Sequence, residues 1–469
     1  MELVDTLVLG TSAARRVGSS PIIPTRNTYV CLLHLTHYLY TCSMSVLSTQ
    51  PYKGTRDFYP EDKRIQKWMF SEMRKVLELH GYEEYDASVI EPYELFASKT
   101  SEEIINDQIY DFEDRGGRRV VLRPEMTPSV SRMVAARRNE LTYPLRWYSL
   151  PNLWRYERPQ KGRLREHWQL NVDLFGASGL MADTEIVIIA DALMQNFGAT
   201  RDTYVIKYNS RKLIQDILQD YFKLDENQLR SVIRLTDRIH KIETSHFKEQ
   251  LMHLVPSGIV DELITLIRSR DLLDVPENIG NESLKHLKDI DDYLRSRGLT
   301  NIQFDMTLMR GFDYYTDFVF EIFDTNPSNN RSMFGGGRYD NLLSLFGAEP
   351  LPTVGFGFGD VTLRIFLEEN DLIPSLGSDV DVYAILLSQE PQAQLIIDEL
   401  RFNDVNVAVD FTGRKLDKCI KTAEKKQIEY VLFIGEDELK TQKYTIKNLK
   451  TGDQKAASIK EIASIITNR

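Results

Sequence analysis

Cysteine is scarce in this sequence of 469 residues, and no metal-binding pattern replaces it. The three cysteines stand at positions 31, 42 and 419, so none belongs to a CxxC pair. The eight histidines form no HExxH motif. These absences leave no recognisable zinc signature, and we expect no metal site built from protein side chains alone. Sparse cysteine also favours a reducing, cytoplasmic compartment.

Long apolar runs and excess positive charge are lacking too. No apolar run is long enough to span a bilayer, so we expect no membrane partner. The net charge of −11 argues against general nonspecific binding of nucleic acid, which depends on neutralising many phosphates. It remains compatible with a nucleic acid held on a local basic patch. The best candidate is 414–460, where Lys and Arg outnumber Asp and Glu.

What is present is typical of a soluble globular protein, with 42% hydrophobic and 27% charged residues. The length predicts two to four domains. Residues 1–43 differ from the rest, because they mix Leu, Tyr, Thr and His without clear periodicity. One interpretation is an over-long gene prediction with Met44 as the true start. A cleaved targeting peptide is the alternative, although Glu2 and Asp5 count against it.

The most informative segment is WRYERPQKGR at 154–163, together with the strand that follows it. With a period of two, Arg155 and Glu157 share one strand face, and Gln169 and Asp173 share a face of the returning strand. Pro, Gln, Lys and Gly at 159–162 form a turn between them. Apolar neighbours on both strands indicate a polar floor set into a hydrophobic body rather than a solvated surface hairpin.

This segment resembles motif 2 of class II aminoacyl-tRNA synthetases, and its loop is similar to that of the histidine-specific enzymes. LMRGFDYYT at 308–316 and GGGRYD at 335–340 resemble the two histidine signatures of that family. The likeness runs from about Tyr52 to the C-terminus. It implies activation of L-histidine with ATP to histidyl-adenylate and pyrophosphate, followed by transfer of histidine to its tRNA.

The resemblance implies an α+β fold: a class II catalytic domain with an antiparallel sheet and flanking helices, a helical insertion, and an α/β anticodon-binding domain. The expected division is an extension at 1–43, a first catalytic segment at 44–208, a helical insertion at 209–299, a second catalytic segment at 300–373, and an anticodon-binding domain at 376–469. Strand and helix patterns alternate at 380–387, 392–402, 405–409, 416–426 and 429–434, which independently predicts a C-terminal α/β domain with a mixed sheet.

Smaller elements follow from local patterns. Apolar spacing predicts a helix from Pro60 that ends at Gly81, then a strand over 82–90 stopped by Pro92. This pair resembles motif 1, which implies a homodimer. A strand at 120–122 precedes RPEMTP and a helix over 129–138, capped by Ser129 or Thr127. Residues 184–196 suggest an amphipathic helix, and 302–304 a strand.

The resemblance assigns cations to the phosphates of ATP, which reacts together with Mg²⁺. The transition state gathers charge on phosphoryl oxygens, so fixed cations are needed rather than a proton carrier. Arg155 is implied at the α-phosphate, and Arg163 at the outer phosphates. Glu157 is implied at the adenine, and Arg310 between the histidine carboxylate and the α-phosphate. Arg165 belongs either to the site or to a solvated rim.

Histidine brings an ammonium, a carboxylate and an imidazole, and each needs a polar partner. Arg155 and Arg310 serve the reacting carboxylate. The remaining candidates are Glu125 and Thr127 with Gln169 for the ammonium, and Asp173 with Tyr315 or Tyr314 for the imidazole. Such a site rejects apolar competitors, because they would leave buried polar groups unpaired.

One motif departs from the family pattern. VGFGFGDV at 354–361 resembles motif 3, but Thr362 stands where the family has an arginine that holds the γ-phosphate. Arg364 lies two residues further, about 200° around a helix, and cannot present the same face. The glycines at 335–337 predict either a strand that approaches the ligand closely or a glycine-rich turn.

Two other functions fit portions of the sequence. A non-catalytic synthetase-like regulatory subunit of histidine biosynthesis would share the fold, but such paralogues usually lose the histidine signatures and the anticodon-type domain. A synthetase-like sensor module of a larger kinase would need a kinase segment, and none is present here. We therefore favour the enzyme.

Overall fold

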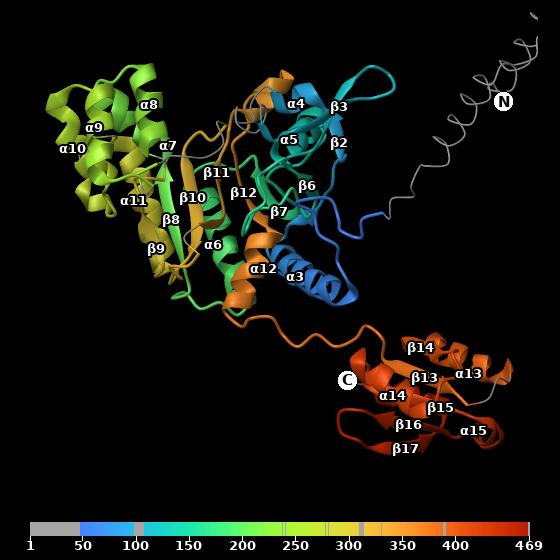
Figure 1. Cartoon of the computed structure of the whole chain (residues 1–469). Helices are drawn as coiled ribbons and strands as arrows, with labels where there is room; N and C mark the ends of the chain where they lie inside the picture. Colours follow the sequence, from blue (N-terminus) through green and yellow to red (C-terminus); the bar gives the residue numbers. More distant parts are fainter. Residues whose placement is uncertain are drawn as a thin grey trace, which may run out of the picture. The chain divides into compact units, whose positions relative to one another are not determined.

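The computed structural model describes residues 47–97, 107–236, 238–239, 241–276, 278–279, 281–308, 314–329, 331–387 and 391–467 (Figure 1). The expected extension at 1–43 and the candidate Arg310 lie outside the described residues. The chain divides into two compact units, Met1–Tyr52 and Lys53–Arg469, and the second contains all of the elements below.

A nine-stranded sheet organises the larger unit, in the order β1-β5-β7-β12-β11-β10-β8-β9, with β6 paired to β7. Neighbouring strands run antiparallel, apart from the parallel pairs β1/β5 and β8/β9. The strands are β1 Glu83–Glu84, β5 Leu145–Ser149, β6 Asn152–Trp154, β7 Glu166–Phe175, β8 Tyr204–Ser210, β9 Ile302–Phe304, β10 Phe318–Asp324, β11 Ser332–Arg338 and β12 Thr353–Gly359. The α+β class with an antiparallel sheet is thus confirmed.

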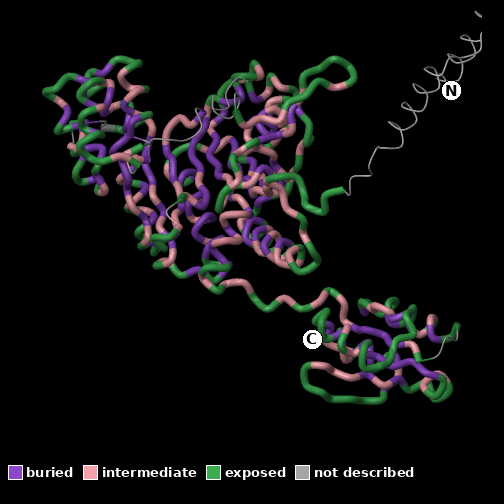
Figure 2. The backbone as a smooth tube through the Cα atoms, viewed as in Figure 1, coloured by how far each residue is buried: buried purple, intermediate pink, exposed green. Residues whose placement is uncertain are grey.

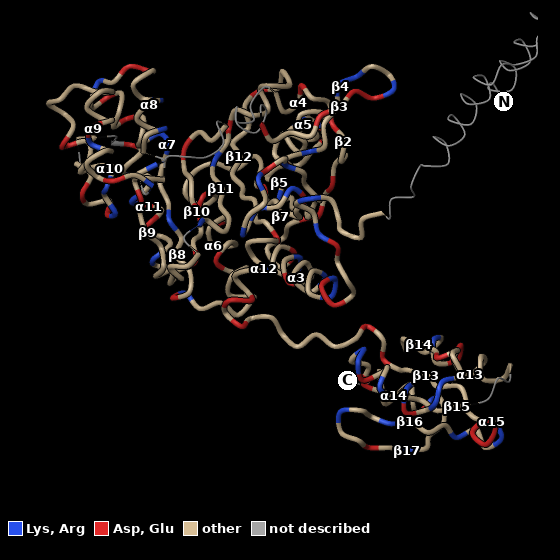
Figure 3. Tube along the Cα trace, viewed as in Figure 1, with Lys and Arg blue, Asp and Glu red and all other residues tan. Residues whose placement is uncertain are grey.

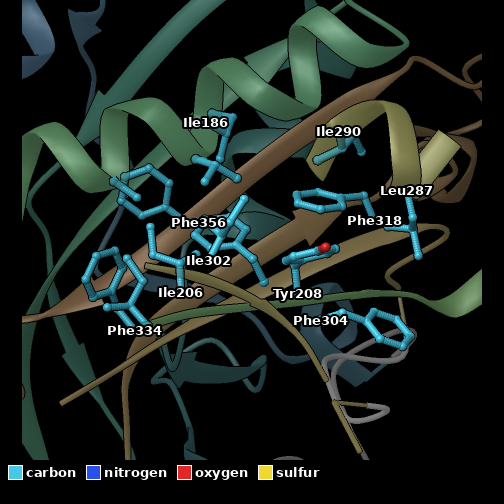
Figure 4. Packing of buried hydrophobic residues seen from close by; sticks show 14 of the residues in the cluster. Ile186, Ile206, Tyr208, Leu287, Ile290, Ile302, Phe304, Phe318, Phe334 and Phe356 are labelled. Atoms are coloured by element: carbon cyan, nitrogen blue, oxygen red, sulfur yellow. The ribbon is translucent and has the colours of Figure 1, made fainter. Parts of the chain in front are cut away.

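The two faces of this sheet differ, because successive side chains of a strand point to opposite sides. In β7, Leu170, Val172 and Leu174 join the main hydrophobic core, and we call this side the core face. The alternate residues, among them Gln169 and Asp173, lie on the other side, which we call the site face. Figure 4 shows the core face filled by rings and branched side chains from β8, β10, β11 and β12, packed against α6 and α11.

Three helices lie near the core face: α3 Pro60–Leu79 of motif 1, α6 Leu180–Asn196, and α12 Asp360–Glu369, which follows the motif 3 strand. Helix α3 begins and ends as predicted, with Pro60 in its first turn and Gly81 just beyond it at φ +76°. The expectation that α6 is amphipathic is wrong. This helix is buried around most of its circumference, because it packs against α3, α11 and β12 at once.

The single strand expected over 82–90 is also wrong. The chain instead forms β1 in the large sheet and β2 Ile90–Pro92 in a separate sheet of order β2-β4-β3, with β3 Tyr110–Glu113 and β4 Arg119–Leu122. Between β1 and β2, the buried Arg123 guanidinium donates to Asp86 Oδ1 at 2.9 Å and to Ala87 O at 2.6 Å. A side chain therefore satisfies this backbone, and the ladder is interrupted.

Helix α5 spans Thr127–Ala136, so it begins earlier than predicted, and the expected cap is wrong. Its N-cap is Met126, without a side-chain capping bond, and neither Thr127 nor Ser129 takes that role. Pro128 removes one N–H from the first turn, which lowers the need for a cap. The Thr127 hydroxyl instead receives a hydrogen bond from Tyr314 at 3.4 Å.

A helical segment follows β8 and precedes β9. It is helical as the sequence predicts, except that 209 and 210 complete β8. Its elements are α7 Arg211–Gln215, a π-helical turn Asp216–Tyr221, α8 Glu226–Thr236, α9 Thr244–Leu254, α10 Val260–Ile267 and α11 Asn281–Ser296. In Figure 1 these helices gather beside β8 and β9, at the edge of the sheet away from β5 and β7.

The C-terminal elements form a five-stranded sheet of order β14-β13-β15-β16-β17. They are β13 Val382–Leu386, α13 Pro391–Phe402, β14 Val407–Asp410, α14 Leu416–Lys425, β15 Tyr430–Ile434, α15 Glu436–Thr441, β16 Tyr444–Asn448, β17 Gln454–Ala457 and α16 Ile459–Thr467. Strands β14, β13 and β15 are parallel to one another, whereas β16 pairs antiparallel with both β15 and β17. The predicted mixed sheet is therefore confirmed. Figure 2 shows the central strands β13 and β15 largely buried, whereas the edge strand β17 is mostly exposed. Over the described chain, no helix has the length and apolar character to cross a membrane.

Candidate active site

Glycines on the site face make room for the polar side chains of β7. Gly355 of β12 stands directly opposite Asp173, and a Cβ atom there would collide with the Asp173 carboxylate. A Cβ atom on Gly357 would collide with the side-chain amide of Gln169. The glycines of the motif 3 strand therefore let the carboxylate and the amide lie flat over the neighbouring strand. That role was not apparent from the sequence.

The three glycines at 335–337 lie in strand β11, so the interpretation as a glycine-rich turn is wrong. Gly335 and Gly337 stand opposite Gly357 and Gly355, which extends the glycine rows across two strands. A Cβ atom on Gly337 would come within 3.1 Å of the Tyr315 ring. Strand β11 thus passes close beneath a residue of the first histidine signature.

Asp173 is the most perturbed acid on this face. Only 4% of its surface is exposed, and its Oδ1 receives a hydrogen bond from the Tyr339 hydroxyl at 2.5 Å. Its Oδ2 is buried without a hydrogen-bond partner among the described residues. Burial raises the pKa of Asp173 from 3.8 to about 7, against the opposing effect of the Tyr339 and Tyr85 hydroxyls. Within the described residues, the nearby Tyr85 hydroxyl is likewise buried without an aligned hydrogen bond, so a donor from a ligand could satisfy Asp173 Oδ2.

The second acid, Glu125, is connected to Asp173 through Tyr314 and Tyr339. It is buried, and its Oε2 accepts the Tyr314 hydroxyl at 3.1 Å. Burial and the Glu125 charge raise the pKa of Tyr314 well above 10, so the tyrosine stays protonated. The Tyr314 ring packs against Tyr315 at 5.1 Å and against Tyr339 at 5.7 Å. This cluster links the Glu125 side of the pocket to the Asp173 side.

Gln169 lies on the same strand face as Asp173. Its side-chain Nε2 donates a hydrogen bond to Oδ1 of the buried Asn171 at 2.7 Å. The structure therefore brings together six candidates from three chain segments: Glu125, Thr127, Gln169, Asp173, Tyr314 and Tyr315. Sequence reasoning missed Tyr85, Asn171 and Tyr339 as their supports. Of these, only Tyr339 had a signal, because it belongs to the GGGRYD signature.

The cationic candidates line the motif 2 hairpin. The side chain of Arg155 donates from Nε to Pro124 O at 2.9 Å, beside the segment that bears Glu125. Burial, Arg155 and Arg56 lower the pKa of His167 to about 3, so this neighbouring imidazole is neutral. Arg163 is half exposed and forms an ion pair with Glu157 at 3.3 Å, which is not aligned as a hydrogen bond.

Arg165 is a buried structural residue, and its interpretation as a solvated rim residue is wrong. Its side chain stacks 3.8 Å from the centre of the Tyr156 ring and donates to Glu157 O at 3.3 Å. It also packs against Gly54, whose φ of +89° and missing Cβ leave space for the arginine stem. Arg165 therefore fixes the base of the hairpin to the N-terminal segment of the catalytic unit.

The motif 3 helix begins at Asp360, which is nearly fully buried. Its carboxylate accepts the Trp168 N–H at 2.9 Å and pairs with Arg56 at 2.7 Å. The Thr362 hydroxyl donates to Met333 O at 2.8 Å, with Gly359 O at 3.0 Å. Thr362 is thus engaged with backbone, and its short side chain carries no charge for a phosphate.

Arg364, further along the same helix, is partly buried between two acids. It pairs with Glu368 at 2.5 Å and approaches Asp62 at 3.8 Å. A cavity of about 410 Å³ is lined by Tyr314 and Tyr315 together with Arg211, Leu229 and Ile233 of the helical segment. Within the portion of the chain that the structure describes, no three His, Cys, Asp or Glu side chains are grouped as a metal site.

Comparison with known proteins agrees with this geometry. A family model described as histidyl-tRNA synthetase matches residues 54–360, and one described as an anticodon binding domain matches 381–469.

The chain belongs to the histidyl-tRNA synthetase family.

The resemblance inferred from the motifs is therefore confirmed. A curated relative from Leptospira biflexa, named histidine–tRNA ligase, is 43% identical over 88% of this chain and 96% of its own. The chloroplastic and mitochondrial histidine–tRNA ligase of Arabidopsis thaliana is 36% identical over 87% and 85%.

Solved structures show the same fold at low sequence identity. The histidyl-tRNA synthetase of Nostoc has a TM-score of 0.76 at 23% identity, covering 90% of this chain and all of its own. A Bacillus halodurans protein titled as ATP phosphoribosyltransferase regulatory subunit/histidyl-tRNA synthetase has a TM-score of 0.69 at 22% identity, covering 83% of this chain and 99% of its own. The fold class is thus shared by histidyl-tRNA synthetases.

Proposed function

We propose that this chain is a histidine–tRNA ligase that activates L-histidine with ATP and transfers it to its tRNA. The observation that carries the proposal is the buried Oδ2 of Asp173, which has no protein donor among the described residues. An imidazole N–H is a donor that such a carboxylate oxygen can accept. Tyr315 supplies a polar partner at the other ring nitrogen.

The rest of the amino acid is recognised by the remaining polar groups. Glu125 and the Thr127 hydroxyl receive the ammonium, with Gln169 beside them. The negative charge of Glu125 suits a cation, and burial strengthens that attraction. A substrate with an apolar side chain would leave Asp173 unpaired, so histidine is selected by the cost of burying unsatisfied polar groups.

The chemical step requires charge stabilisation more than proton transfer. The histidine carboxylate attacks the α-phosphate, the bond to pyrophosphate breaks, and negative charge gathers on the phosphoryl oxygens. In our proposal Arg155 holds the α-phosphate, Arg163 the outer phosphates and Glu157 the adenine. Arg310 bridges the two reacting groups on the strength of its motif alone. Mg²⁺ arrives with ATP and neutralises some of the triphosphate charge.

The C-terminal elements are proposed to bind the anticodon region of the histidine tRNA, within a domain spanning 376–469. Lys and Arg recur among these elements (Figure 3), as a phosphate backbone requires. The proposed catalytic domain is divided into 44–208 and 300–373 by a helical insertion at 209–299. Deleting 376–469 should leave histidine activation largely intact and abolish efficient transfer to tRNA. Unchanged transfer after the deletion would assign the domain to another partner.

We also propose a cytoplasmic homodimer built on the motif 1 region. The three-stranded sheet exposes Ile90 and Phe112, and the residue that precedes it, Val89, is exposed as well. Each has more than a third of its surface accessible. Apolar side chains clustered on one small sheet are typical of an interface. Light scattering at working concentration should give the mass of two chains, and a monomer would contradict the proposal.

The decisive experiment is ATP–pyrophosphate exchange, run with each of the twenty amino acids and without tRNA. We expect exchange with histidine alone. Exchange with several amino acids would contradict the assigned pocket. No exchange with any of them would favour the non-catalytic regulatory subunit, for which the Thr362 departure is the one supporting feature.

A further inference from the structure

The cations around the tip of the motif 2 hairpin are mostly neutralised by carboxylates. We define the hairpin tip as residues 159–162. Lys161 pairs with Glu369 of α12 at 2.5 Å, and Arg163 pairs with Glu157. Below the tip, Arg56 is paired with the buried Asp360. The charge of each of these side chains is therefore partly neutralised by a carboxylate of the protein before ATP binds.

Arg331, just before β11, differs from them. Its guanidinium donates to Lys161 O at 3.4 Å and to Gln160 Oε1 at 3.1 Å, and both acceptors are neutral. No carboxylate of the described residues lies within ion-pair distance of it. The side chain is thus oriented by two weak contacts while its full positive charge remains available, and several of its five donors stay unused.

The position of Arg331 relates it to the missing motif 3 cation. The Thr362 hydroxyl binds Met333 O, two residues along the chain from Arg331. On the other side, a Cβ atom placed on Gly162 would lie 3.7 Å from Thr362 Cγ2, so the hairpin tip rests over Thr362. Arg331 contacts the same tip through Gln160 and Lys161. Thr362, the hairpin tip and the start of β11 therefore meet at one place.

We propose that Arg331 binds the outer phosphates of ATP and supplies the cation that residue 362 does not. The inference rests on the proposed function, because it presumes that ATP lies with its triphosphate beneath the hairpin tip. A triphosphate carries about four negative charges, and Arg163, the cation proposed above for the outer phosphates, is already paired with Glu157. A guanidinium anchored by neutral acceptors can grip phosphate oxygens bidentately without first breaking an ion pair.

In this proposal, the cation for the outer phosphates comes from Arg331, just before β11, instead of from residue 362 of helix α12. An arginine at 362 would extend from the first turn of α12 into space that the hairpin tip covers. Arg331 approaches the tip from β11 instead, and it contacts the tip backbone directly. Its role is to hold the pyrophosphate leaving group in line with the attacking carboxylate, with no proton transferred.

The first test compares Arg331→Ala with Arg364→Ala in histidine-dependent pyrophosphate exchange. Arg364 is a matched control, because it is an arginine of the same region whose charge is held by two carboxylates, those of Asp62 and Glu368. We expect Arg331→Ala to raise KM for ATP roughly 10- to 100-fold, the loss of one charge-assisted contact, with KM for histidine changed less than about twofold. Arg364→Ala should change neither constant by more than about twofold. An unchanged KM for ATP in Arg331→Ala overturns the proposal.

A binding measurement separates a phosphate contact from a structural role. Calorimetry would compare ATP, in the presence of histidinol, with histidyl-sulfamoyl-adenosine, an adenylate mimic that lacks outer phosphates. Arg331→Ala should weaken ATP and leave the mimic unchanged, and Arg331→Lys should recover some of the loss. Equal weakening of both ligands would make Arg331 structural and overturn the proposal. If the wild-type protein bound no mimic, the proposed function itself would fail, which is a distinguishable result.

Discussion

The core face and the site face of the large sheet are built from the same strands, yet their chemistry is opposite. On β7 and β12, Leu170, Val172 and Phe356 belong to the main hydrophobic core, while the alternate residues Asp173 and Gly355 lie on the site face. The core face is filled by side-chain volume. The site face depends on missing volume, since glycines on one strand accommodate polar side chains from the next. Stability and recognition are thus separated by the period of two along a strand.

The largest effect should follow from filling the site face. Gly355→Ala places a methyl group against the Asp173 carboxylate and the Val172 carbonyl, so both would have to shift. We expect histidine activation to fall by at least a thousandfold in pyrophosphate exchange, because small displacements of reacting groups are costly. Gly258→Ala is the control, since a methyl group there meets no neighbouring atom within 4 Å. Similar activities for the two variants would show that the pocket tolerates volume at this position.

Removing side-chain volume from the core face should lower stability and leave histidine recognition largely unchanged. Leu170 is fully buried in the main core, and Leu170→Ala should lower the free energy of unfolding by about 2–5 kcal/mol. KM for histidine should change little, provided that the protein remains folded at the assay temperature. Chemical denaturation would measure the free energy of unfolding, and pyrophosphate exchange on the same samples would measure KM for histidine. A large rise in KM with unchanged stability would mean that the two faces are not separable.

A smaller effect concerns the stability cost of Asp173. Its pKa rises from 3.8 in the unfolded chain to about 7 in the fold, so the native state binds the proton more tightly. Stability from this group therefore falls as pH rises from about 4 to about 7. Asp173→Asn removes the penalty, and its Tm should exceed that of the wild type at pH 8. The difference should vanish near pH 4. A lower Tm at pH 8 would show that the carboxylate stabilises the fold.

The smallest predicted effect is the pH dependence of histidine binding. The proposed complex contains an ionised Asp173 and a neutral imidazole. With a pKa of about 7 in the free protein, lowering the pH from 8 to 6 should weaken histidine binding about tenfold. Asp173→Asn serves as the control, because any dependence that remains there belongs to the ligand. An equal pH dependence of histidine binding in both proteins would show that Asp173 is not the titrating group.

Much of this comparison was predictable from the sequence. The alternation around WRYERPQKGR placed Gln169 and Asp173 on one strand face, and the structure confirms that placement. The same alternation placed Arg155 and Glu157 on a strand face, which is wrong, because β6 ends at Trp154 and the Glu157 N–H bonds back to Arg155 O at 2.7 Å. The mixed C-terminal sheet and helix α3 also followed from periodicity and from proline and glycine positions. These features depend on local patterns, which a single chain segment displays in full.

The errors came from tertiary contacts that no local pattern contains. The strand expected over 82–90 is interrupted because Arg123, from a distant segment, satisfies its backbone. Arg165 is buried because Tyr156 and Gly54 close around it. The glycine rows of β11 and β12 make sense only in the cross-strand register with β7. The same holds for Arg331, whose neighbours at the hairpin tip lie about 170 positions earlier in the chain.

The most direct test of the central claim is a pair of calorimetric titrations on Asp173→Ala, one with histidine and one with ATP. The account predicts that histidine affinity falls roughly 10- to 100-fold, since a buried imidazole loses its acceptor, while ATP affinity stays within about twofold of the wild type. Equal losses for the two ligands, or no loss for histidine, would contradict the claim that the site face places Asp173 to receive the imidazole.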